Sequence, residues 1–244
     1  MIRYNIQTAN AARKLYAELT ESSIVDDESY SRLVNAFCGQ KIQIVCRHLT
    51  SSIDGCSSIK EKGLVGWSDV MSDKTTHLSR VLAEIGIFYT DGRLVYKSGD
   101  RKKDLTSVIG LRHLQIDDCI NAYLHCSKND EGYSKSPEIL RSLANSLSCN
   151  CLSKMVNSWE EGAEPYCAEF SVSPNDIDVI TDWYSANSDD LSCMNKALSN
   201  LLLDVIENRY PRNHPVILKK GVTIPPNRLI ISKFDEIDWD FEME

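Results

Sequence analysis

The sequence predicts an α+β fold. Residues 5–38 carry apolar side chains at helical spacing, which predicts amphipathic helices before the first strand. The β-branched run at residues 42–45 then predicts a buried strand. Further along, Asp91 and Gly92 stand between two apolar stretches, and this pair is typical of the type I′ turn of a β-hairpin.

The composition is that of a globular protein. With 244 residues, of which 42% are hydrophobic, the chain can bury a substantial core. The net charge of −8 gives no overall basic footprint and disfavours nucleic acid as a binding partner, although a local basic groove stays open and nucleic acid stays open as a substrate. We find no signal-peptide run and no apolar stretch long enough for a membrane span, so we expect a cytoplasmic protein with no membrane partner.

The nine cysteines are an odd number in a chain that is neither short nor secreted, so we expect thiols and no disulfide framework. Cys149 and Cys151 form the tightest pair. No second pair and no histidine follows them at zinc-finger spacing, so no metal site is predicted, and a labile metal or redox site is the alternative at this pair.

The first 40 residues predict a helical extension. Two amphipathic helices are separated by the acidic residues 26–28, and either Ser23 or Asp27 would cap the second helix. We expect these helices to pack on the main body of the protein. The alternative is an arm that contacts a partner or a target.

The strand that starts at Ile42 ends at His48 and Thr50, and the helix that follows would be capped by Gly63. Residues 101–104 predict a basic, solvated loop. Further along the chain we expect a helix over 78–85, a hairpin over 87–96, a short helix over 111–115, strands over 119–126, 166–172, 215–218 and 228–234, helices ending at 147 and over 194–206, and an acidic tail over 235–244.

The segment from His48 to Leu64 resembles the first motif of the ADP-ribosyltransferase superfamily. In that motif a strand ends in His-x-Ser/Thr and a helix ends in Ile-x-x-x-Gly-Leu, which here are His48, Thr50, Ile59, Gly63 and Leu64. The resemblance implies a split antiparallel β-sheet with flanking helices over residues 41–234, between the extension at 1–40 and the tail at 235–244. It also implies that His48 bonds the ribose of NAD, while Leu49 and Thr50 hold the nicotinamide carboxamide.

A second resemblance to the same family, and to poly(ADP-ribose) polymerases in particular, lies in a strand tyrosine followed by Ser-Lys-Ser at a helix start. Tyr123 would be this tyrosine, and the helix start would be Ser134-Lys135-Ser136, with Ser136 bonding the carboxamide. In another register Ser127-Lys128 takes this part and Tyr133 stacks on the nicotinamide. In the first register Ile139 stands where the family has its stacking tyrosine.

The family's third element is a catalytic glutamate at the start of the penultimate strand, where its carboxylate stabilises the charge that develops as nicotinamide leaves. That position falls at or beside His214, which carries no carboxylate. Glu169 or Glu207 would have to supply it, or the activity is lost or altered. We favour Glu169, because the strand around it also resembles the family's catalytic strand.

The resemblance therefore implies an NAD-dependent ADP-ribosyltransferase-like protein that passes ADP-ribose to an unidentified macromolecule, protein or nucleic acid, as toxins and phage-defence effectors of this kind do. The alternatives are a binding or regulatory module that has lost the carboxylate, and an NAD glycohydrolase. A relative of the tRNA 2′-phosphotransferases would need arginines around a phosphate, and only Arg47, Arg80 and Arg112 are candidates.

Overall fold

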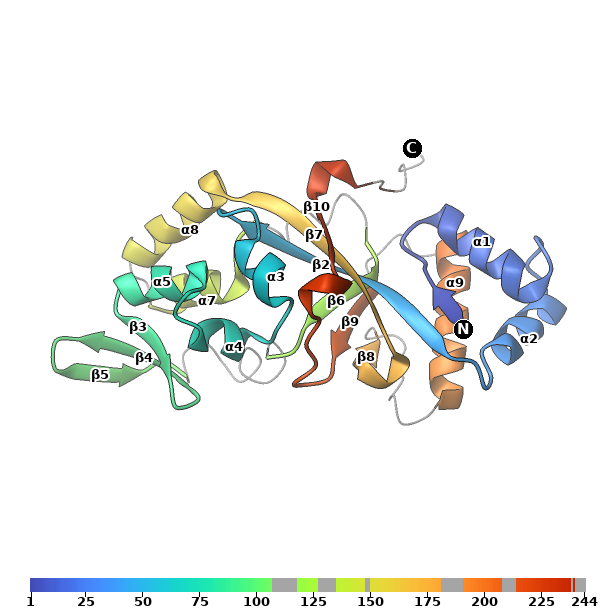
Figure 1. The fold of residues 1–244 in the computed structure, drawn as a ribbon, viewed down its shortest axis with the longest axis horizontal. Coiled ribbons are helices and arrows are strands. Elements are labelled where there is room, and N and C mark those ends of the chain that lie inside the picture. The colour runs from blue at the N-terminus through green and yellow to red at the C-terminus, as the bar shows by residue number, and fades with distance from the viewer. Residues whose placement is uncertain are drawn as a thin grey trace.

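The fold combines helices with antiparallel β-sheets. The computed structural model describes residues 1–106, 118–126, 135–147, 150–180, 191–207, 214–237 and 239. Figure 1 shows an elongated molecule with the main sheet at its centre and helices at both ends. Within the described residues, no helix has the length and apolar character needed to cross a bilayer.

The strands are β1 (Ile2–Tyr4), β2 (Ile42–Ser52), β3 (Ile87–Thr90), β4 (Arg93–Ser98), β5 (Arg101–Asp104), β6 (Asn121–His125), β7 (Glu164–Val172), β8 (Ile177–Ile180), β9 (His214–Leu218) and β10 (Ile230–Lys233). The helices are α1 (Ala9–Thr20), α2 (Asp27–Ala36), α3 (Ser57–Lys62), α4 (Trp67–Ser72), α5 (His77–Glu84), α7 (Glu138–Leu147), α8 (Asn150–Gly162) and α9 (Leu191–Glu207). Short 3-10 turns η2 (Pro174–Asp176), η3 (Pro226–Arg228) and η4 (Phe234–Glu236) lie near the later strands.

The main sheet has the strand order β10-β7-β2-β6-β9-β8, with β1 paired to β2 as well. Strand β2 pairs with β7 through nine residues, but with β6 only through Arg47 and Tyr123. The sheet therefore consists of two halves, β10-β7-β2 and β6-β9-β8, that separate between β2 and β6. We call this place the split.

The N-terminal 40 residues are more than the helical extension that we expected. Strand β1 pairs in parallel with the start of β2, and side chains of α1 and α2 belong to the same hydrophobic core as the main sheet and α9. The cap of α2 also differs from the prediction. Asp26, rather than Ser23 or Asp27, accepts the hydrogen bond of the Ser29 amide and forms a capping box with that residue.

A smaller sheet, β3-β4-β5, lies at the opposite end of the molecule from α1, α2 and α9 (Figure 1). The predicted hairpin is confirmed, because Asp91 and Gly92 both have positive φ angles, of 53° and 73°. The prediction of a loop at residues 101–104 is wrong, since these residues pair with β4 as strand β5. A second hydrophobic core, formed with α4, α5, α7 and α8, supports this sheet.

Candidate functional site

His48 lies on β2 directly beside the split. Its Nδ1 is 2.7 Å from the main-chain carbonyl oxygen of Asn121 on β6. Because a carbonyl can only accept, Nδ1 carries the proton and Nε2 is left as an acceptor. Burial lowers the pKa of His48, so its ring is neutral at physiological pH. The side chain is nevertheless only half-buried, and Nε2 can therefore accept a hydrogen bond from a ligand hydroxyl.

Gln7 occupies the split on the other side of the pair formed by Arg47 and Tyr123. Its Nε2 donates to two main-chain carbonyls, Val45 on β2 at 3.3 Å and Tyr123 on β6 at 3.0 Å. The residue is almost fully buried, and its Oε1 has no hydrogen-bond partner among the residues that the structure describes. Side chains of His48 and Gln7 thus replace the backbone ladder that β2 and β6 do not form.

The strand register places the expected site residues on two faces of the sheet. Side chains alternate along a strand, and directly paired residues share a face. Tyr123 pairs with Arg47, so both lie on the face that Leu49 also occupies. His48 and Thr50 lie on the opposite face. The expectation that His48 and Tyr123 face a common site is therefore not met by the strand register.

Glu169 shares the face of Arg47, its register partner on β7. One oxygen of Glu169 is 3.3 Å from Nε of Arg47, and the other is 3.8 Å from a terminal nitrogen of Arg3. The ring of Trp239 covers the Arg47 guanidinium, with 5.4 Å from its carbon to the ring centroid. In this structure Glu169 therefore neutralises a buried arginine on the face opposite His48, while its expected role beside His48 stays a prediction.

The same contacts show whether Arg47 could bind a phosphate, as the phosphotransferase alternative requires. Arg47 is 8% exposed, bonded to Glu169 and covered by Trp239, so it is not open to a phosphate. Arg80 lies on α5, and Arg112 is outside the described residues. Among the described residues, Arg47 is thus unavailable to the arginine set that this alternative requires.

His214 is the first residue of β9 and pairs with His125 on β6. The two ring centroids are 6.1 Å apart. Burial, and secondarily the charge of His125, lowers the pKa of His214 to about 4, so the ring is neutral at pH 7. His125 Nδ1 donates to the carbonyl of Ile6 at 3.0 Å. The start of the penultimate strand therefore carries a buried, uncharged imidazole, and Glu207 ends α9 upstream of it.

Ser136 is almost fully buried just before α7, and its hydroxyl donates to Glu160 of α8 at 2.8 Å. This bond uses the proton that the resemblance assigns to the nicotinamide carboxamide. Ser136 could still accept a hydrogen bond from the amide nitrogen of a ligand. Tyr133, Ser134 and the alternative register at residues 127–128 lie outside the described residues.

Gly63 and Leu64, directly after α3, contact the loop between β9 and β10. Gly63 caps α3 with a φ of 87°, as the sequence predicts. A Cβ at this position would lie 2.0 Å from the carbonyl oxygen of Ile224, which only a glycine avoids. Leu64 and Ile224 exchange both main-chain hydrogen bonds, each 2.9 Å long. The Gly-Leu ending of the first motif thus has a structural reason in this chain.

Two further features bear on binding. An open pocket of about 340 Å³ lies between α5 and α8, with Ile53, His77 and Trp159 among its lining residues. Within the described ranges, no three His, Cys, Asp or Glu side chains are grouped so that they could hold a metal ion. Cys151 is disulfide-bonded, so the expectation of thiols alone is wrong at this residue.

No match was found. The chain was compared with protein-family models, with curated proteins and with solved structures. The function is therefore inferred from the contacts around the split.

Sequence reasoning missed the residues that hold the split together. Gln7 and Asn121 form hydrogen bonds with strands that are distant in the sequence, and neither residue belongs to a recognisable sequence motif. The sequence contains one weak signal of the pairing between Arg47 and Glu169. A charged residue in the middle of an apolar strand requires a partner.

Proposed function

We propose that the protein is ADP-ribosyltransferase-like and binds NAD beside His48, at the split of the main sheet. The observation that carries this proposal is the split itself. The strand with His48 adjoins the strand with Tyr123, and this adjoins the strand that starts with His214, while β2 and β6 share one residue pair. The family resemblance implies this neighbourhood and a cleft between two small sheets.

The contacts of His48 support a role in binding ribose. Its Nδ1 is held by the Asn121 carbonyl, which fixes the ring and leaves Nε2 to accept from a ribose hydroxyl. Thr50 lies two residues further along the same face of β2 and would adjoin the carboxamide. Gly63 and Leu64 hold α3 and the segment after it against the Ile224 loop.

The histidine at the start of β9 and the pairing of Glu169 with Arg47 favour binding over transfer. At the start of β9 the neutral His214 can donate or accept a hydrogen bond, but it cannot stabilise a developing positive charge as a carboxylate would. Glu169 is paired with Arg47 on the opposite face. We therefore propose a binding or regulatory protein that does not turn NAD over repeatedly.

The experiment combines NAD titration by calorimetry with an assay for released nicotinamide, using NAD labelled in its adenylate portion. We expect saturable binding of NAD, no multiple turnover, and an affinity loss of about tenfold or more for His48→Ala, since a hydrogen bond to a ligand is worth about 1.5 kcal/mol. Tyr30→Phe removes one hydrogen bond of a half-buried side chain on α2; it is the control and should bind NAD like the wild type.

Two further variants separate binding from transfer. His214→Glu restores a carboxylate at the start of β9 and should raise nicotinamide release, whereas His214→Gln, with the same size and no charge, should not. Glu169→Gln should leave NAD affinity unchanged. Rapid release by the wild-type protein that Glu169→Gln abolishes would replace this proposal with ADP-ribose transfer or NAD hydrolysis, and label on a macromolecule would separate these two. Absence of NAD binding would overturn the proposal.

A further inference from the structure

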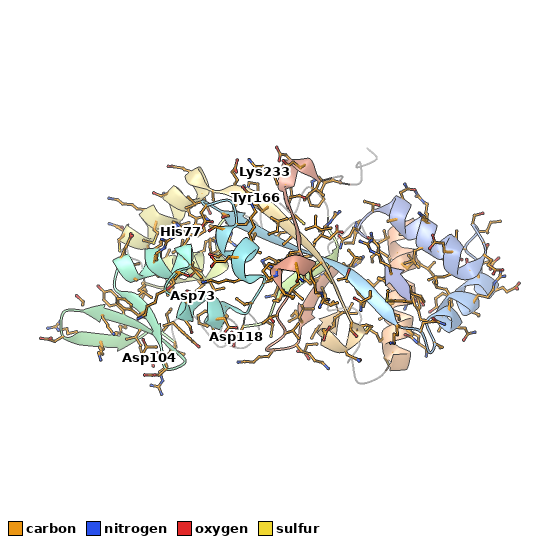
Figure 2. All side chains as sticks on the ribbon, in the orientation of Figure 1. Asp73, His77, Asp104, Asp118, Tyr166 and Lys233 are labelled. Carbon is orange, nitrogen blue, oxygen red and sulfur yellow. The ribbon has the colours of Figure 1, made fainter. Side chains whose placement is uncertain are left out.

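The small sheet β3-β4-β5 is a basic region in an acidic protein. Residues 87–104 contain five lysines and arginines against three aspartates, whereas the whole chain has a net charge of −8. All four residues of β5 are exposed, and β5 is an edge strand. Figure 1 shows β4 and β5 projecting from the body of the protein, and Figure 2 places Asp104 on this projection. We call these three strands the basic arm.

The register separates the two faces of the basic arm. Ile87 and Leu94 face the supporting hydrophobic core. The other face carries Phe88, which pairs with Val95, and Lys97, which pairs with Lys102, and it also carries Asp104, the second partner of Val95. Phe88 and Val95 are half-buried, whereas both lysines are exposed. This outer face therefore combines an aromatic ring with cations on neighbouring strands.

The outer face contains an unfavourable pair of charges. Lys97 and Lys102 lie directly opposite each other in the ladder, and like charges in this arrangement destabilise a sheet. The Nζ of Lys97 lies 5.1 Å from the centroid of the Phe88 ring, which is a cation–π contact and supplies no negative charge. In the part of the chain that the structure describes, the ion pair on this arm joins Arg93 to Asp104. An anion bound between Lys97 and Lys102 would turn their repulsion into attraction.

We propose that the outer face of the basic arm binds single-stranded nucleic acid. Lys97 and Lys102 contact phosphates, Arg93 flanks them, and the ring of Phe88 offers an apolar surface to an unstacked base. Exposed cations interleaved with aromatic rings are the arrangement by which single strands are bound without sequence preference. A duplex offers its phosphates but not its base faces, so the aromatic ring favours a single strand. This binding does not require NAD.

The test is fluorescence anisotropy with labelled 20-nucleotide single-stranded DNA and RNA of mixed sequence, without NAD, over a range of salt concentrations. Two to three phosphate contacts predict that log K falls with log salt at a slope of about −2. Lys97→Gln with Lys102→Gln should weaken binding about tenfold at low salt and reduce this slope. Phe88→Leu should weaken binding and leave the slope unchanged.

Two matched pairs serve as controls. Arg13→Gln with Lys14→Gln removes two exposed cations from α1, at the other end of the molecule, and should change affinity by less than about twofold. Arg101→Gln with Lys103→Gln removes two from the opposite face of the arm and should have an intermediate effect. Equal losses in all three pairs, no binding to either oligonucleotide at low salt, or tighter lysine-dependent binding to phosphatidylserine vesicles or to duplex DNA would each overturn the proposal. Because NAD is absent, failure here leaves the proposed NAD site untouched.

Discussion

The two edges of β2 are held in different ways. On one edge, nine residues pair with β7 in an unbroken antiparallel ladder. On the other, β1 pairs with the first three residues of β2, and β6 contributes one pair. Side chains bridge this second edge, because Gln7 donates to Val45 and Tyr123, and His48 bonds the carbonyl of Asn121.

The difference shows which edge of β2 is sensitive to the substitution of a single side chain. A ladder distributes its hydrogen bonds over many backbone groups, so no single side chain decides it. At the split, by contrast, individual groups connect the halves: Gln7, His48, and the Arg47 and Tyr123 pair. Single substitutions at these positions should therefore have large effects.

The largest effect is expected for Gly63→Ala. A side chain at φ 87° is strained, and its Cβ would overlap the Ile224 carbonyl oxygen, so we expect a loss of about 4 kcal/mol in the free energy of unfolding. Gly221→Ala is the matched control, since Gly221 has a φ of 81° with no atom within 4 Å of an added Cβ. It should lose only about 1 kcal/mol in urea unfolding. Equal losses would mean that contact with Ile224 does not matter.

The second-largest effect is expected in the pH dependence of the free energy of unfolding. The pKa of His214 is about 4 in the folded protein, below the unfolded value of about 6.5, so the unfolded chain binds this proton more tightly. The contribution of His214 to the free energy of unfolding is fully present above pH 6.5. It is lost as the pH falls towards 4, and the total loss is about 3 kcal/mol.

Urea unfolding at pH 7.5, 5.5 and 4.5 measures this loss, and the comparison with His214→Gln isolates it. His48 also has a pKa lowered by burial and contributes in the same direction, so part of the slope should persist in the variant. A slope identical in both proteins would refute the assignment to His214.

A smaller effect is expected for Gln7→Met, which keeps the length of the side chain but removes the donor. The carbonyls of Val45 and Tyr123 then lose a buried partner, at a cost of about 2 kcal/mol. Gln43→Met, on β2 and half-buried, should cost less than about 0.5 kcal/mol in the same urea unfolding assay. If both variants unfold alike, Gln7 does not bridge the halves.

Local patterns predicted the local elements well. The type I′ turn at Asp91 and Gly92 and the cap at Gly63 depend on residues adjacent in the chain, and both are confirmed. Strand β5 was missed because an exposed strand has no apolar alternation to reveal it. Strand β1 was missed because three residues are too short for a pattern and gain their structure by pairing with β2.

The sequence by itself determined the hairpin turn at Asp91 and Gly92, the cap at Gly63, and the absence of a carboxylate at His214, because these follow from local spacing and residue identity. Only the tertiary structure decided which of the expected site residues meet. The register of β2 with β6 and β7 places His48 on one face and Tyr123 and Glu169 on the other. Because a shift of one residue exchanges the two faces of a strand, strand pairing sets this arrangement and no pattern along the chain records it.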